Sequence, residues 1–261
     1  MDGALWVAKT GLQAQDARMT EIANNLANVN TTGFKSGRVD FEDLLYQNMS
    51  QPGGSTSTQT QQPTGLMMGT GVRIVASEKN FAEGSLTQTN DPLDVAINGQ
   101  GFIQVLLPNG TLAYTRAGDL KINNEGQLVT DDGYTIQPGI TLPQNTQSVT
   151  IGSDGTVSVA VPGQAQPEQV GTLTLANFIN PPGLQPMGQN LYLQTEASGP
   201  PQIGTPGVNG LGTLEQGDLE ASNVNVAEQL VDMIQTQRAY EINTNAIQAS
   251  SQMLQDLSQA A

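Results

Sequence analysis

The sequence contains neither cysteine nor histidine. The chain therefore cannot form a disulfide, hold zinc through thiolate or imidazole ligands, or build a catalytic triad that depends on histidine. The lack of thiols is compatible with an oxidising compartment but does not by itself fix one. Aromatic residues make up only 4% of the chain, whereas it has 29 glycines and 14 prolines. This composition favours a turn-rich protein over a compact, aromatic-cored enzyme.

Basic residues are also few. Nine Lys and Arg oppose 24 Asp and Glu, which gives a net charge of -15, and Arg238 is the only basic residue after Lys121. A chain of this charge is repelled by phosphate, so we expect no nucleic-acid partner. Solubility is the simplest reason for the acidic balance.

Long apolar runs are missing as well. No stretch of about 18 apolar residues could cross a bilayer, so we expect no membrane insertion. The opening MDGALWVAKTG lacks the basic and apolar regions of a cleaved signal peptide. We therefore expect any export from the cytoplasm to use a route without a cleaved signal.

The first thirty residues predict a helix from about Leu5 to Val29. Its apolar residues recur at a spacing of seven, with companions three residues further on, and Gln15 interrupts the second series. These residues, the N-terminal row, are Leu5, Leu12, Met19, Leu26 and the companions Ala8, Ile22 and Val29. Such spacing is typical of a coiled-coil seam. We expect the helix to end at Thr31-Thr32-Gly33, with Gly33 as a left-handed cap.

The last forty residues predict a second helix, with Ser222 or Asn223 as its N-cap. Its apolar residues, the C-terminal row, are Val226, Leu230, Met233, Tyr240, Ile247 and Leu254. The companion positions Gln237, Thr244 and Ser251 are polar. The two rows could pair as an assembly seam, but a half-polar pair of helices is marginal alone. We therefore expect both helices to need neighbouring copies of the chain.

The intervening sequence predicts a β-rich region. Segments such as LLPNGTLAYT, KINNEGQLVT, TDDGYTIQP and GSDGTVSVAV place turn dipeptides beside alternating apolar residues. The expected fold class is α+β, with terminal helices pairing as a coiled coil and a β-rich domain inserted between them. The expected parts are an N-terminal helix (1–33), a connector with a Gln/Ser/Thr-rich arm (34–80, arm 46–67), a β-rich outer domain (81–210) and a C-terminal connector and helix (211–261).

The asparagines near the end of the first helix allow two interpretations. Asn24, Asn25 and Asn28 could simply cap a frayed helix end. They could instead hydrogen-bond to neighbouring backbone and fix the register, as buried asparagines do in coiled coils. The sequence alone does not separate these alternatives.

Residues that suggest chemistry have simpler explanations. Asp131-Asp132 precedes Gly133 in a predicted hairpin turn, and Asn98–Gly101 is a glycine-rich turn without the Lys-Ser/Thr of a phosphate loop. Asp91, Asp94 and Asn98 lack the spacing of an EF-hand. We therefore expect no catalytic, cofactor-binding or metal-binding residues.

Four segments in the same order resemble the bacterial flagellar rod and hook family. They are ANNLANVNTTGFKSGR (23–38), DPLDVAINGQGFIQV (91–105), YTRAGDLKINNEGQLVTDDGY (114–134) and SNVNVAEQLVDMIQTQRAYEINTNAIQASSQML (222–254). The residues assigned to the family motif are Asn24, Asn25, Asn28, Thr32, Gly33, Phe34 and Arg238. Chain length and the segment 41–75 are most similar to the distal rod members of this family.

This resemblance implies a structural role. Such proteins form helical homopolymers whose terminal helices build an inner tube, and they leave the cell unfolded through the flagellar type III export apparatus. The implied partners are other copies of the chain, proximal rod and hook-side subunits, and the ring proteins of the peptidoglycan layer and outer membrane. The implied site is the flagellar basal body, where the rod is a drive shaft across the periplasm.

Two further segments are hypotheses within this role. The arm, marked by Gln47, Gln61 and Gly65, would lie against neighbouring subunits and stiffen the shaft, although its composition also fits a solvated loop. Phe41 and Leu45 in FEDLL resemble an export-recognition element, although amphipathic core packing would give the same pattern.

A proximal rod or hook subunit is an alternative within the same family, and two other classes of protein are alternatives outside it. A β-rich carbohydrate-active enzyme would need separated carboxylates and aromatic platforms in a groove, and this chain has a single tryptophan, Trp6. A monomeric binding module is the remaining alternative, and sedimentation with and without basal-body seeds would separate it from a polymer subunit.

Overall fold

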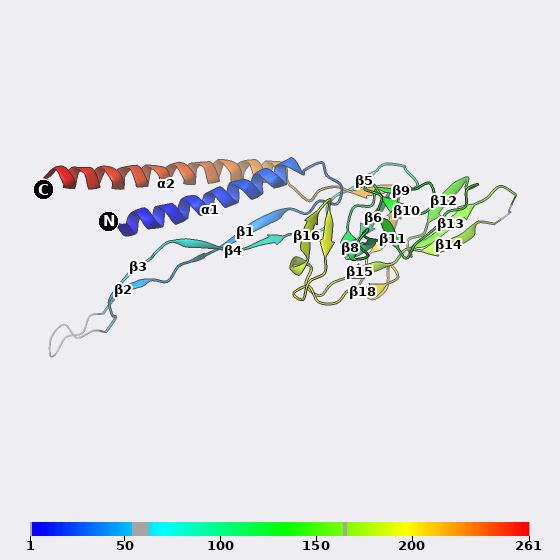
Figure 1. Ribbon diagram of the computed structural model, residues 1–261, viewed down its shortest axis with the longest axis horizontal. Coiled ribbons are helices and arrows are strands. Elements are labelled where there is room, and N and C mark those ends of the chain that lie inside the picture. Colours follow the sequence, from blue (N-terminus) through cyan, green and yellow to red (C-terminus); the bar gives the residue numbers. More distant parts are fainter. Residues whose placement is uncertain (1, 54–62, 164–165, 261) are drawn as a thin grey trace. The chain divides into compact units, whose positions relative to one another are not determined.

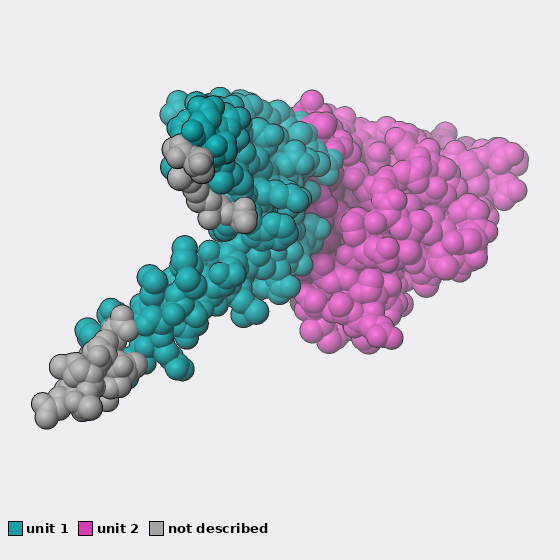
Figure 2. All heavy atoms as spheres, turned by 60° about the vertical axis from the view of Figure 1, so that its left-hand side comes forward, with its two compact units in different colours: residues 1–26, 37–78, 225–261 teal, residues 27–36, 79–224 magenta. Residues whose placement is uncertain are grey.

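The computed structural model describes residues 2–53, 63–163 and 166–260. The chain forms two compact units (Figure 2): unit 1 contains residues 1–26, 37–78 and 225–261, and unit 2 contains residues 27–36 and 79–224. Each unit is thus assembled from segments that are far apart in the sequence. The predicted α+β class is confirmed, because helices at both ends of the chain flank a series of strands (Figure 1).

Unit 1 contains the two long helices and two β-ribbons. Helix α1 spans Asp2–Ala27 and helix α2 spans Val226–Ala260, and the two lie side by side (Figure 1). One ribbon pairs β1 (Gly37–Asp43) with β4 (Val72–Lys79), and the other pairs β2 (Gln47–Ser50) with β3 (Leu66–Met68). The segment expected as a connector is therefore mostly strand within the described residues.

The helix boundaries differ from those predicted. Helix α1 ends at Ala27 rather than Val29, and a turn follows in which the Thr31 amide donates to the Asn28 carbonyl at 3.2 Å. The asparagines at this point favour turns over helix, which explains the early end. Helix α2 is capped by Asn225, whose Oδ1 accepts from the Ala227 amide at 3.1 Å, rather than by Ser222 or Asn223.

Unit 2 is built from short antiparallel strands. The largest sheet has the order β16-β17-β8-β7-β11-β10-β9, and β15 pairs with both β7 and β18. A second sheet has the order β12-β13-β14, and two further pairs are β19-β6 and β20-β5. The strands are β5 (Leu86–Gln88), β6 (Val95–Asn98), β7 (Phe102–Leu106), β8 (Leu112–Thr115), β9 (Leu120–Ile122), β10 (Leu128–Thr130), β11 (Thr135–Gln137), β12 (Ser148–Ile151), β13 (Thr156–Ala160), β14 (Glu168–Thr172), β15 (Leu175–Asn177), β16 (Gln185–Gly188), β17 (Leu191–Leu193), β18 (Gln202–Gly204), β19 (Thr213–Gln216) and β20 (Asp218–Glu220), with a 3-10 helix, η1, at Pro181–Gly183.

The predicted hairpins are confirmed. Antiparallel pairs β7–β8, β9–β10, β10–β11 and β12–β13 match the four segments that carry turn dipeptides. Asp131 and Asp132 lie in the β10–β11 turn, where Gly133 has a φ of 85°. Asn98–Gly101 joins β6 to the strand β7, so no helix follows this glycine-rich turn.

The core of unit 2 has an aliphatic and an aromatic part. The aliphatic part gathers the inward residues of the strands, for example Ile97, Val105 and Leu128. Five of the eleven aromatic residues form the second part, where Phe81, Phe102, Tyr114, Phe178 and Tyr192 make edge-to-face contacts.

The predicted outer domain, 81–210, lies within unit 2, which also includes residues 27–36 and 211–224. Strands β19 and β20 account for the C-terminal extension, because they pair with β6 and β5. Among the described residues, neither long helix is apolar enough to cross a membrane.

Candidate assembly surfaces

The two helices of unit 1 pack antiparallel. Arg18 of α1 forms an ion pair of 3.1 Å with Asp232, and Asn25 donates from Nδ2 to Gln229 Oε1 at 3.2 Å. Nearer the start of α1, a Cβ added to Gly11 would lie 3.1 Å from the side chain of Asn243. Partner numbers rise along α2 as they fall along α1, which is the signature of an antiparallel pair.

The residues of α2 that face α1 are polar. Thr236 is 1% exposed and Ser250 is buried, while Gln229 and Asn243 are half-buried. These four residues are seven apart, one residue before the polar companions that sequence analysis singled out. Contact within the chain thus buries little apolar surface on α2.

The assembly seam is partly covered in the single chain. In the N-terminal row Ala8 and Ile22 are buried, and Leu5, Leu12, Met19, Leu26 and Val29 are half-buried. In the C-terminal row Met233 and Ile247 are half-buried, and Val226, Leu230, Tyr240 and Leu254 are exposed. Other apolar residues of α2 are exposed too, namely Val231, Ile234, Ile242 and Met253. These side chains need a cover that the described residues of unit 1 do not supply.

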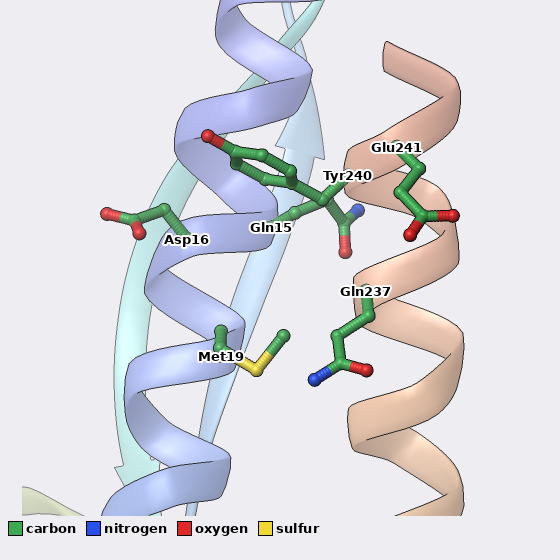
Figure 3. Close-up of a pocket in the computed structure, with 6 residues that line it drawn as sticks. All are labelled: Gln15, Asp16, Met19, Gln237, Tyr240 and Glu241. Atoms are coloured by element: carbon green, nitrogen blue, oxygen red, sulfur yellow. The ribbon is translucent and has the colours of Figure 1, made fainter. Parts of the chain in front are cut away.

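One groove lies where the two rows meet (Figure 3). It has a volume of about 340 Å³ and is lined by Gln15, Asp16, Met19, Gln237, Tyr240 and Glu241. The ring of Tyr240 reaches across toward α1, and the side chains of Met19 and Gln237 point toward each other. Met19 belongs to the N-terminal row and Tyr240 to the C-terminal row, so the seam borders this open groove.

Asn25 is buried and connects elements of unit 1 through hydrogen bonds; such a connection is called a tie below. It is 2% exposed, its Nδ2 donates to the Gly37 carbonyl at 2.8 Å, and its Oδ1 accepts from the Gly37 amide at 2.8 Å. Together with the bond to Gln229, these contacts join α1, β1 and α2. Asn25 is therefore not a cap of a frayed helix end, because it bonds to the first strand and α2 of its own unit. A role of the asparagines in fixing the register between copies stays a prediction.

Thr10 makes a second tie between α1 and a ribbon. Its Oγ1 accepts from the Val72 amide at 3.3 Å, at the start of β4, and donates to the Val7 carbonyl at 2.8 Å. Thr10 and Asn25 are fifteen residues apart, about 22 Å along a helix. The β1–β4 ribbon is thereby attached to α1 at two separated points.

The motif residues that follow α1 belong to unit 2. Gly33 has a φ of 67°, and a Cβ added there would lie 2.7 Å from backbone atoms of Arg116 and Ala117. The Thr32 carbonyl accepts from Asn190 Nδ2 at 2.8 Å, and Phe34 is buried. Gly33 was expected to end the helix, but its left-handed conformation instead permits a close approach to another segment of unit 2.

Next to this motif is a buried group of charges. Lys35 Nζ lies 2.5 Å from Glu220 Oε1 and donates to the Ala82 carbonyl at 2.8 Å, and Arg116 Nη1 lies 3.2 Å from Glu220 Oε2. Burial lowers the pKa of Lys35, and the neighbouring Arg116 acts in the same direction, whereas the Glu220 carboxylate opposes both. One carboxylate thus stands between two cations and links residues far apart in sequence.

Several of the remaining predicted residues that the structure describes are exposed. Phe41 is 36% exposed and Leu45 is 91% exposed, so Leu45 does not pack in a core of the described chain. Gln47 begins β2, and Gly65 passes close to the Ser50 carbonyl, where a Cβ would clash. Gln61 lies outside the described residues, Asn24 is exposed and Asn28 is half-buried.

Sequence reasoning missed several of these residues. Lys35, Arg116 and Glu220 are isolated charges in the sequence, and no local pattern links them. The polar row on α2 could have been found, because Gln229, Thr236, Asn243 and Ser250 repeat every seven residues. The described residues contain no group of three or more Asp or Glu placed to hold a metal ion.

The chain thus combines long helices that pair mainly through polar residues, and that expose apolar side chains on α2, with a separate β-sheet unit. These features are typical of a subunit of a larger assembly. Three family models match: "Flagella basal body rod protein" over residues 5–35, "Flagellar hook protein FlgE/F/G D1 domain" over 96–159 and "Flagellar basal body rod FlgEFG protein C-terminal" over 215–260.

Similar proteins cover almost the whole chain. The chain is 56% identical to the flagellar basal-body rod protein FlgG of Buchnera aphidicola subsp. Schizaphis graminum, over 98% of each chain. It is 46% identical to that of Caulobacter vibrioides over 98% of each chain, and 47% identical to that of Borreliella burgdorferi over 96% of each. The chain belongs to the flagellar basal-body rod protein family and is a structural subunit of that rod.

Proposed function

We propose that this chain forms the distal part of the rod, as a helical homopolymer that carries torque from the motor to the hook. The proposal rests on one observation: the chain is 46–56% identical, over 98% of its length, to rod proteins named FlgG. The exposed apolar residues of α2 support it, because burial of such side chains stabilises contacts between copies. The role is mechanical, and none of the described residues needs to act as a catalyst.

Torque sets a physical requirement on the subunit. A shaft resists twisting when each copy contacts several others, so that no single contact carries the load. Long helices with apolar rows on more than one side can make such contacts, and the ties at Asn25 and Thr10 keep the β1–β4 ribbon attached to α1. The expected partners are other copies, proximal rod and hook-side subunits, and the peptidoglycan-layer and outer-membrane ring proteins.

Replacement of the rod gene of a motile strain tests the proposal. We expect a strain that makes this chain in place of its own FlgG to swim, and its isolated basal bodies to contain the chain in the part of the rod next to the hook, inside the surrounding rings. Basal bodies that lack the chain, or that contain it only at the proximal end of the rod, would contradict the proposal.

The β2–β3 ribbon is the proposed stiffening arm. Leu66, Met67 and Met68 are each more than half exposed, as is Met49 on the paired strand. An exposed apolar ribbon favours contact with a neighbouring copy over a solvated loop. Deletion of residues 47–65 should give curved or flexible rods in electron micrographs. Straight rods of unchanged stiffness would disprove the arm.

Phe41 and Leu45 are the proposed export element, read by the type III apparatus before folding. The exposure of Leu45 removes core packing within this chain as a sufficient explanation for that residue. Phe41→Ala should abolish secretion at normal cytoplasmic levels, whereas Tyr46→Ala, a matched change at a neighbouring exposed aromatic residue, should be secreted. Normal secretion of Phe41→Ala would rule out the export role.

A further inference from the structure

The groove between α1 and α2 combines an apolar floor with acidic edges. Met19 and Tyr240 supply the apolar surface, while Asp16 and Glu241 lie on its two sides (Figure 3). Neither carboxylate has an ion-pair partner within residues 2–53, 63–163 and 166–260. The groove therefore offers two unneutralised negative charges beside apolar surface to a group from outside the chain.

The side of α2 that faces away from α1 carries a positive charge and apolar side chains, which complement the acidic and apolar residues of the groove. Arg238 is exposed and forms no ion pair within the described part of the chain. Ile234 and Ile242, four residues before and after it, are 52% and 68% exposed and share its face. At about 100° per residue, Arg238 lies roughly 140–160° around the helix from Thr236 and Asn243, the residues that face α1.

We propose that the groove of one copy receives this outward face of α2 from an adjacent copy. Arg238 then lies between Asp16 and Glu241, and Ile234 and Ile242 pack on the apolar floor. The inference rests on the proposed function, because it requires a homopolymer, and it names one contact within that polymer.

Position and symmetry both favour a second copy as the occupant. The groove is lined by residues 237–241 of α2, and the outward face consists of residues 234–242. Two copies that lie side by side without an axial shift therefore place the outward face of one copy next to the groove of the other. The two surfaces are neighbouring but not identical: around α2, Arg238 lies about 60° from Glu241 and about 160° from Tyr240. Such a heterologous contact repeats from copy to copy and builds a ring or filament instead of closing as a dimer.

Disulfide cross-linking tests the contact directly. The chain has no cysteine, so Asp16→Cys with Arg238→Cys introduces its only thiols. Rods containing this double variant, oxidised after isolation, should give a ladder of linked dimers, trimers and larger multimers that collapses on reduction. A disulfide needs Cβ atoms within about 4.5 Å, so the matched control Ala23→Cys with Arg238→Cys, at an exposed residue of α1 seven residues and about 10 Å further along the helix, should give no ladder.

The outcomes separate this contact from the proposed function. If the double variant is present in rods but gives no more multimers than the control, the contact is disproved and the rod assignment stands. If the unsubstituted chain is itself absent from rods, the rod assignment fails.

Charge exchange provides a second test should the cysteine variant not assemble. Arg238→Glu should prevent rod assembly, and addition of Asp16→Arg and Glu241→Arg should restore it. Normal rods with Arg238→Glu alone, or no restoration by the triple variant, would overturn the contact.

Discussion

Asn25 and Gly37 exchange two hydrogen bonds, each 2.8 Å long, between the side-chain amide of the helix residue and the backbone of the first strand. Asn25 is buried, with 2% of its surface exposed, and Gly37 is half-buried. This contact attaches the β1–β4 ribbon to α1 near the point where the chain leaves the helix. The same amide group also reaches α2 through Gln229.

Asn25→Ala should destabilise unit 1. The substitution removes the partner of the half-buried Gly37 amide and carbonyl, which costs about 1–3 kcal/mol. Hydrogen exchange should show faster exchange of the Gly37 amide. Gln13→Ala, on the exposed side of α1, is the control and should change neither quantity, and equal effects of the two variants would refute the tie.

Gly33→Ala should prevent normal folding of unit 2, because a Cβ would lie 2.7 Å from backbone that cannot move aside easily. Gly133→Ala is a matched control: it also has a positive φ, 85°, but nothing lies within 4 Å of its added Cβ. The control should lose only the roughly 1–2 kcal/mol of backbone strain. Urea unfolding gives the loss of stability in each variant and so separates the steric clash from the backbone strain. Equal losses of stability in Gly33→Ala and Gly133→Ala would contradict the close approach at Gly33.

Glu220→Gln should cost more stability than Lys35→Met. The first change leaves two buried cations, Lys35 and Arg116, without a counter-charge, which costs about 3–5 kcal/mol. The second leaves Glu220 paired with Arg116. The free energy of unfolding can be measured by near-ultraviolet circular dichroism, with Glu168→Gln at an exposed position as the control. The loss of stability should be largest in Glu220→Gln, smaller in Lys35→Met and smallest in Glu168→Gln. A larger loss in Lys35→Met than in Glu220→Gln would refute the account of the charge group.

The sequence predicts the helices and hairpins well for a physical reason. Seven-residue spacing and Asn-Gly or Asp-Gly turns depend only on residues close together in the sequence. They can therefore be recognised without knowing how the rest of the chain folds. The α2 boundary was missed by only a few residues, since Asn225 competes with Asn223 as a cap. Asn223 is used elsewhere: its Nδ2 donates to the Asn80 carbonyl at 2.8 Å.

The partners of the motif residues could not be predicted in the same way. Asn25 meets Gly37 and Gln229, and Gly33 meets Arg116, only because segments distant in sequence converge. The heptad pattern correctly marks apolar rows but cannot tell whether a row faces the partner helix of the same chain or a neighbouring copy. The buried positions Thr236 and Ser250 show that the contact within the chain uses the polar row, one residue away from the predicted companions.

The central claim is that α1 and α2 gain their stability from neighbouring copies, because their contact within one chain is mainly polar and isolated helices are marginal. Hydrogen exchange on the dilute monomer and on assembled rods tests this claim most directly. The account predicts that amides of residues 229–250 exchange rapidly in the monomer and become protected in rods, while strand β7 is protected in both. Protection of both helices in the dilute monomer as strong as that of β7 would contradict it.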